Sequence, residues 1–178
     1  MVKTFKEEFE EKLIALGFSY RSSHDGFYIL RDENDINYLI SVQLIESILP
    51  NKQKYGSKNG NDIHAIGLFI VKQIKTEPKP DFFIFTFRNP RKNLSEYIII
   101  PFEELERRLF NVNSDSNHYK MIKLVFWLMK DGSIYNTTNI SIEAEWYYLS
   151  KGINDRMADK TDMDYTKFLN SWYRLKPS

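Results

Sequence analysis

The chain has 178 residues, of which 42% are hydrophobic and 15% aromatic; this composition can build the core of one compact domain over residues 1–178 and excludes wholesale disorder. Its 25 Lys and Arg residues balance 24 Asp and Glu residues, which excludes a uniformly basic surface, so a nucleic-acid site would have to be a local patch. The absence of cysteine excludes disulfides, thiolate zinc sites, iron–sulfur clusters and thiol nucleophiles.

The distribution of apolar residues argues against a membrane segment. No stretch reaches the ~18 uninterrupted apolar residues of a membrane span, and the first 18 residues interleave charged with apolar side chains. We therefore expect a soluble, cytoplasmic protein with no membrane partner.

The first part of the chain predicts a helix followed by a hairpin. Phe5, Phe9, Leu13 and Leu16 recur at helical spacing, so we expect a helix over 3–16 that ends at Gly17. Two apolar runs separated by a polar turn, 27–30 and 38–44, predict an antiparallel hairpin. The polar stretch 50–62 is typical of a loop.

The rest of the chain alternates strand and helix signals. We expect three strands over 63–75, 82–87 and 96–100, then a helix over 102–110, which has acids in its first turn and arginines in its last. Further on, we expect strands over 121–129 and 140–149 around an Asp131-Gly132 turn, and a closing helix over 165–175. These elements predict an α/β or α+β domain with a central mixed β-sheet flanked by helices, in which 120–178 forms a C-terminal β extension and helix.

One group of residues in the middle of the chain could carry chemistry. Gln73 and Lys75 alternate onto the same side at the end of the third predicted strand, and Asp62 precedes that strand at the exit of the loop. Oxygen ligands such as Asp62 and Gln73 can hold Mg²⁺, and a lysine can orient the attacking water or neutralise developing charge. This combination suits the hydrolysis of a phosphodiester bond.

The same residues resemble a known family. The spacing Asp62-x10-Gln73-x-Lys75 is similar to that of the PD-(D/E)XK nuclease superfamily, in variants where glutamine replaces the acid. The resemblance spans roughly 60–110, since QIKT (73–76) is followed by PDFFIF (80–85) and YIIIPFEEL (97–105), as in nuclease-like proteins of bacterial defence systems. It implies a restriction-endonuclease-like fold, with Asp62 and Gln73 as Mg²⁺ ligands and Lys75 as the catalytic lysine. An acid of the first helix, Glu8 or its neighbours Glu7 and Glu11, would be an accessory metal ligand.

Other readings of these residues stay open. Strands commonly end in Gln and Lys because their ends emerge into water, and Asp62 follows Asn61, where the family has proline. Gln73 brings no charge to a metal, so it binds Mg²⁺ more weakly than an acid would.

Basic and aromatic residues around this region could contact nucleic acid. Phosphate groups attract Lys and Arg, and tyrosine can stack on sugars or bases. The candidates lie in the 50–62 loop and around the following strands: Lys52, Lys54, Tyr55, Lys58, Lys72, Lys79, Arg88 and Arg91.

The sequence thus supports two functions of different classes. The first is a Mg²⁺-dependent DNA endonuclease of restriction or defence type, which would act as a homodimer because a cut across duplex DNA needs two sites. The second is a non-catalytic module that binds DNA or a protein partner on the same scaffold or on another β-rich one.

Overall fold

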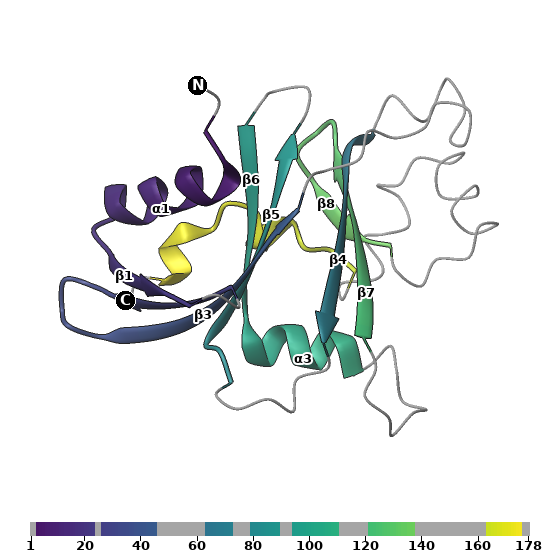
Figure 1. Ribbon diagram of the computed structural model, residues 1–178. Coiled ribbons are helices and arrows are strands. Elements are labelled where there is room, and N and C mark those ends of the chain that lie inside the picture. Colours follow the sequence, from purple (N-terminus) through teal and green to yellow (C-terminus); the bar gives the residue numbers. More distant parts are fainter. Residues whose placement is uncertain are drawn as a thin grey trace.

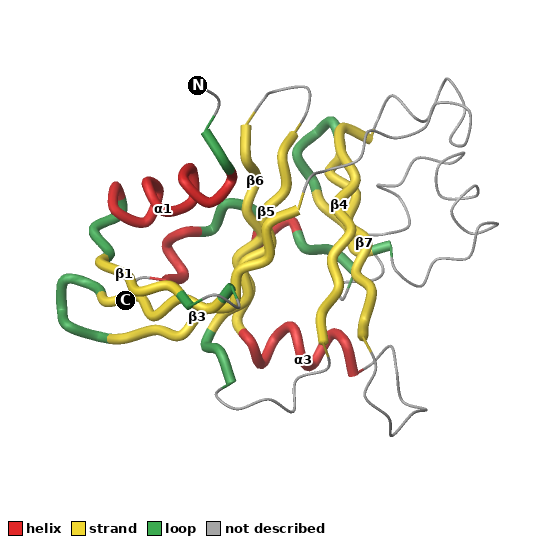
Figure 2. The backbone as a smooth tube through the Cα atoms, in the orientation of Figure 1, coloured by secondary structure: helices red, strands yellow, loops and turns green. Residues whose placement is uncertain are grey.

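The computed structural model describes residues 3–23, 26–45, 63–72, 79–89, 94–110, 121–137 and 163–175. In these ranges the chain is a mixed α+β protein with two α-helices and two β-sheets (Figure 1 and Figure 2). The predicted class is confirmed at this level, although the strands form two sheets where one was expected. None of the helices described is long and apolar enough to cross a membrane.

The larger sheet is mixed. Its strands follow the order β1 (Ser19–Ser22), β2 (Phe27–Arg31), β3 (Asn37–Ile45), β5 (Phe82–Asn89) and β6 (Leu94–Pro101). Neighbours are antiparallel except β3 and β5, which are parallel. The predicted hairpin is confirmed as β2 and β3, and Asp32 closes it because its Oδ1 accepts the amide protons of Asn34 and Ile36.

The smaller sheet joins the middle of the chain to its second half. Its antiparallel strands are β4 (Ile63–Lys72), β7 (Met121–Met129) and β8 (Ile134–Asn136), in that order. The Asp131-Gly132 turn is confirmed, but the strand after it begins at Ile134, and the range 140–149 lies outside the described residues. Because β7 and β8 pair with β4, the second half of the chain completes a sheet that starts within residues 60–110.

The two sheets pack face to face, and a helix covers the far side of the larger one (Figure 1). Phe85 of β5 contacts Phe69 of β4 and Phe126 of β7, with ring centroids 5.0 and 5.8 Å apart. On the opposite face of the larger sheet, Phe9 and Leu13 of α1 (Phe5–Ala15) are fully buried. Most of β5 is buried because the strand is covered on both faces.

Both predicted α-helices are confirmed, with ends set by local chemistry. At the start of α1, Thr4 and Glu7 form a reciprocal capping box, and after its end Gly17 takes a φ of +88°, which a residue with a side chain rarely adopts. The second helix, α3 (Phe102–Phe110), follows Pro101 and has Glu103 and Glu104 in its first turn and Arg107 and Arg108 in its last. It runs under the ends of β4 and β7 (Figure 1).

The C-terminal segment (163–175) corrects the prediction of a single closing helix. It contains two short 3-10 helices, η1 (Thr166–Phe168) and η2 (Trp172–Leu175), with an extended stretch between them. In that stretch Leu169 bridges to Ile98 of β6, and Asn170 exchanges hydrogen bonds with the backbone of Tyr97. Asp164 bridges to Tyr135 of β8, so this segment lies along an outer strand of each sheet and joins the two. A continuous helix could not make these strand-like contacts.

Candidate functional site

The predicted catalytic residues Asp62, Gln73 and Lys75 lie outside the described residues. The strand between them is described: β4 has ten residues, and a strand rises about 3.3 Å per residue, so its ends are roughly 30 Å apart. Asp62 immediately precedes this strand and Gln73 immediately follows it. The roles of Asp62 and Gln73 as metal ligands and of Lys75 as catalytic lysine therefore stay predictions.

The structure places the predicted accessory ligand Glu8 in an ion pair. One oxygen of its carboxylate accepts a hydrogen bond from the Arg88 guanidinium, and the other accepts one from the Ser95 hydroxyl. Arg88, a predicted nucleic-acid contact, also lies over the Phe5 ring, 5.1 Å from its centroid. Glu8 and Arg88 therefore tie α1 to β5 and β6, and Glu8 would have to give up both contacts to bind a metal.

The neighbouring acids of α1 are also engaged. Glu7 belongs to the capping box, where the hydrogen bonds from the Thr4 backbone and hydroxyl lower the pKa of its carboxyl. Glu11 pairs with Lys3 at 2.7 Å. Among the described residues, no three His, Asp or Glu side chains come together as a metal site.

The remaining predicted nucleic-acid contacts divide into two sets. Lys52, Lys54, Tyr55, Lys58 and Arg91 lie outside the described residues. Of the other two, Lys72 ends β4, and the exposed Lys79 has its Nζ 5.3 Å from the ring centroid of Phe102 at the start of α3. Both therefore belong to the end of the molecule that carries α3 (Figure 1).

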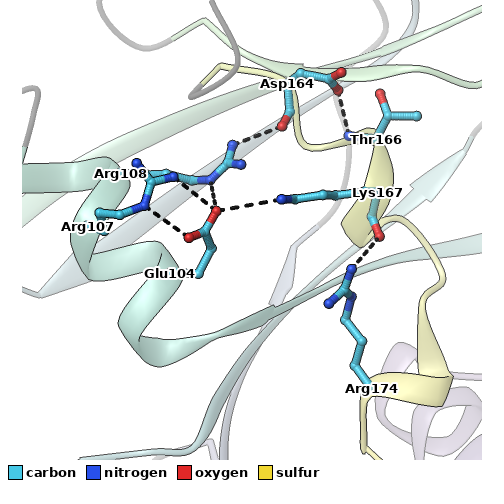
Figure 3. A network of polar contacts seen from close by, with 7 residues as sticks. All are labelled: Glu104, Arg107, Arg108, Asp164, Thr166, Lys167 and Arg174. Carbon is cyan, nitrogen blue, oxygen red and sulfur yellow. Dashed lines mark hydrogen bonds and ion pairs between the residues drawn. The ribbon is translucent and has the colours of Figure 1, made fainter.

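At this end four cations gather around one carboxylate and one aromatic ring, and Figure 3 draws the cations and the carboxylate. We call this group, Arg107, Arg108, Lys167 and Arg174, the cation cluster. The carboxylate is that of Glu104, which accepts hydrogen bonds from Arg107 Nε and Nη2, both at 3.1 Å, and from Arg108 Nε at 2.8 Å. Lys167 Nζ lies 3.9 Å from the same carboxylate. The helix α3 and the C-terminal segment thus meet at Glu104.

The aromatic ring is that of Phe168, which is 1% exposed. Arg108, Lys167 and Arg174 lie 5.0, 5.0 and 5.1 Å from its centroid, within the range of cation–π attraction. Two hydrogen bonds to backbone carbonyls complete the arrangement. Arg108 Nη1 donates to the carbonyl oxygen of Asp164 at 2.9 Å, and Arg174 Nη2 donates to the carbonyl oxygen of Lys167 at 3.5 Å. Arg108, Lys167 and Arg174 are therefore held in place by a buried ring, and the two arginines also by the backbone of the C-terminal segment.

Two cations of the cluster, Arg107 and Lys167, reach the surface beside an ionised carboxylate. Hydrogen bonds from Arg107 and Arg108 lower the pKa of Glu104 to about 2, so its carboxylate is ionised at neutral pH. The four cations share the site with the carboxylates of Glu104 and Asp164 (Figure 3), and Glu103 and Glu106 lie on the same helix as the two arginines. Arg107 and Lys167 keep 50% and 59% of their side chains exposed, so their charges reach the surface.

Sequence reasoning did not find this site. It assigned Arg107 and Arg108 to the helix dipole, and Lys167 and Arg174 to a closing helix. The only signal is the pair of adjacent arginines ending an amphipathic helix, which says nothing of a partner some sixty residues later.

Comparisons with protein-family models, with curated proteins and with solved structures found no match for this chain.

Proposed function

We propose that this chain binds nucleic acid without cleaving it, and that the cation cluster is the contact surface. The observation that carries the proposal is the gathering of four cations around Glu104 and Phe168, with the side chains of Arg107 and Lys167 exposed at the surface. Phosphate groups supply most of the affinity in such complexes, and Arg and Lys neutralise them.

The cluster is suited to phosphates because its geometry is set before binding. The guanidinium of Arg107 is oriented by two bonds to Glu104, and the ammonium of Lys167 lies against the Phe168 ring. A side chain that is already ordered loses less conformational entropy on binding. The exposed Lys79 lies toward the same end of the molecule and would extend the surface along a nucleic-acid strand.

The experiment is a titration of fluorescently labelled single-stranded and duplex DNA at about 50 and 200 mM salt. We expect the double variant Arg107→Gln/Lys167→Gln to bind DNA roughly 10-fold or more weakly than wild type. The slope of its log K against log salt concentration is expected to be shallower by about one to two units.

The matched control is Lys6→Gln/Arg31→Gln. It removes the same two charges from exposed ion pairs elsewhere, at side chains that are 57% and 56% exposed, and is expected to bind like wild type. Equal losses in both double variants, or no binding by wild type, would contradict the proposal.

A Mg²⁺-dependent DNA endonuclease of restriction or defence type, cytoplasmic and homodimeric, is the second candidate. The order of elements along the chain supports this candidate: β4 and β5 are followed by β6, which ends at Pro101, and then by α3. The resemblance to restriction-endonuclease-like proteins implies the same order. Plasmid incubated with Mg²⁺ or Mn²⁺ separates the two candidates. Cleavage by wild type that is lost in Lys75→Ala would favour the nuclease. If the protein binds DNA but leaves the plasmid intact, the result favours the non-catalytic protein.

A further inference from the structure

An exposed aromatic ring lies beside the cation cluster. Tyr173 of η2 is 67% exposed. Among the described residues this is the highest value for a large hydrophobic side chain, and the other exposed ones, such as Ile14 and Leu94, are aliphatic. Burial of an aromatic ring is strongly favourable, so a ring left this open has a large apolar surface available to a ligand.

The ring is connected to the cluster by Arg174. The guanidinium of Arg174 lies 5.2 Å from the centroid of the Tyr173 ring and 5.1 Å from that of Phe168. The same guanidinium donates to the carbonyl of Lys167. Tyr173, Arg174 and Lys167 therefore form one continuous surface of ring and positive charge.

The position of Tyr173 is fixed by its neighbours in the chain. Trp172 is 9% exposed and its ring lies 4.8 Å from that of Tyr97, and Leu175 is fully buried. Because both residues are anchored in the core, the short helix η2 holds the Tyr173 ring outward. A ring presented in this way needs little ordering when a ligand binds.

We infer that the nucleic acid bound by this protein is single-stranded, and that Tyr173 stacks on an unpaired base while Lys167 and Arg107 contact flanking phosphates. The inference rests on the proposed function and adds the class of ligand. Every base has a flat face that can stack on an aromatic ring, but in a duplex these faces are occupied by neighbouring base pairs. A ring next to cations therefore discriminates single strands from duplexes.

The test compares single strands of about 12 nucleotides, one of DNA and one of RNA, with a duplex of the same length. Wild type is expected to bind the better single strand more tightly than the duplex. Tyr173→Ala is expected to weaken single-strand binding about 5- to 150-fold, the range for loss of one base–aromatic stack, and to leave duplex binding unchanged. Tyr173→Phe keeps the ring and is expected to bind within about twofold of wild type.

The failures of the two proposals are distinguishable. If no nucleic acid binds wild type, the proposed function fails and this inference with it. If nucleic acid binds but Tyr173→Ala matches wild type on single strands, or weakens duplex binding equally, only the inference is overturned. Loss of affinity in Tyr173→Phe would show that the hydroxyl, and not the stacked ring, makes the contact. Thermal unfolding of each variant, expected to match wild type because the side chain is exposed, checks that the fold is intact.

Discussion

At the scale of single residues, Glu104 holds the cation cluster together. Its carboxylate bonds two arginines and lies near Lys167, and one of the arginines, Arg108, is only 4% exposed. Removing the negative charge would take away the counter-charge that Glu104 supplies to these cations, and weakening the pairing of a buried cation is costly.

We predict that Glu104→Gln lowers the free energy of unfolding by about 1 to 3 kcal/mol at neutral pH, since the pair is partly buried. The pKa of Glu104 in the folded protein, about 2, lies below its usual 4.5, so between these values the unfolded chain binds more protons. The stabilisation is therefore complete above about pH 4.5 and is lost as the pH falls toward 2.

Urea unfolding of wild type and Glu104→Gln at several pH values measures this effect. The difference between the two proteins should shrink as the pH falls through that window. A difference that stays constant down to low pH would show that the Glu104 charge does not stabilise the fold.

At the scale of elements, local periodicity was enough to predict α1, α3, the β2–β3 hairpin and the strands β5 and β6. It missed β1, because Ser19–Ser22 is polar and mostly exposed and is ordered by pairing with β2. It also misassigned the C-terminal segment. The spacing of Phe168 and Trp172 fits a helix, but the contacts of Asn170 with Tyr97 on β6 are formed between distant parts of the chain, and no local pattern encodes them. The cation cluster was missed for the same reason.

Asn170 tests this account of the C-terminal segment. Its side chain accepts the Tyr97 amide proton at 3.0 Å and donates to the buried Glu96 carboxylate at 2.7 Å, and its φ is +51°. We predict that Asn170→Ala lowers the free energy of unfolding by about 1 to 3 kcal/mol, from lost hydrogen bonds and from an unfavourable left-handed backbone.

Two further variants separate these contributions in the same urea titration. Asn170→Gly tolerates the positive φ, so its difference from Asn170→Ala measures the backbone part. Asn34→Ala, at an exposed turn position, is the control and is expected to match wild type. Wild-type stability in Asn170→Ala would contradict the proposed role of these contacts.

At the scale of the whole molecule, the C-terminal segment links structure to the proposed function. It joins the two sheets through bridges to β8 and β6, and it also supplies Lys167, Tyr173 and Arg174 to the binding surface. The proposed surface therefore lies where α3 meets the C-terminal segment (Figure 3).

The most direct test of this account is amide hydrogen exchange with and without a short single-stranded oligonucleotide. We predict slower exchange on binding in α3 and in residues 163–175, where the cation cluster and Tyr173 lie, and unchanged exchange in β1 and β2 at the other edge of the larger sheet. Protection confined to β1 and β2, with none in α3 or 163–175, would contradict the assignment of the cation cluster as the nucleic-acid contact surface.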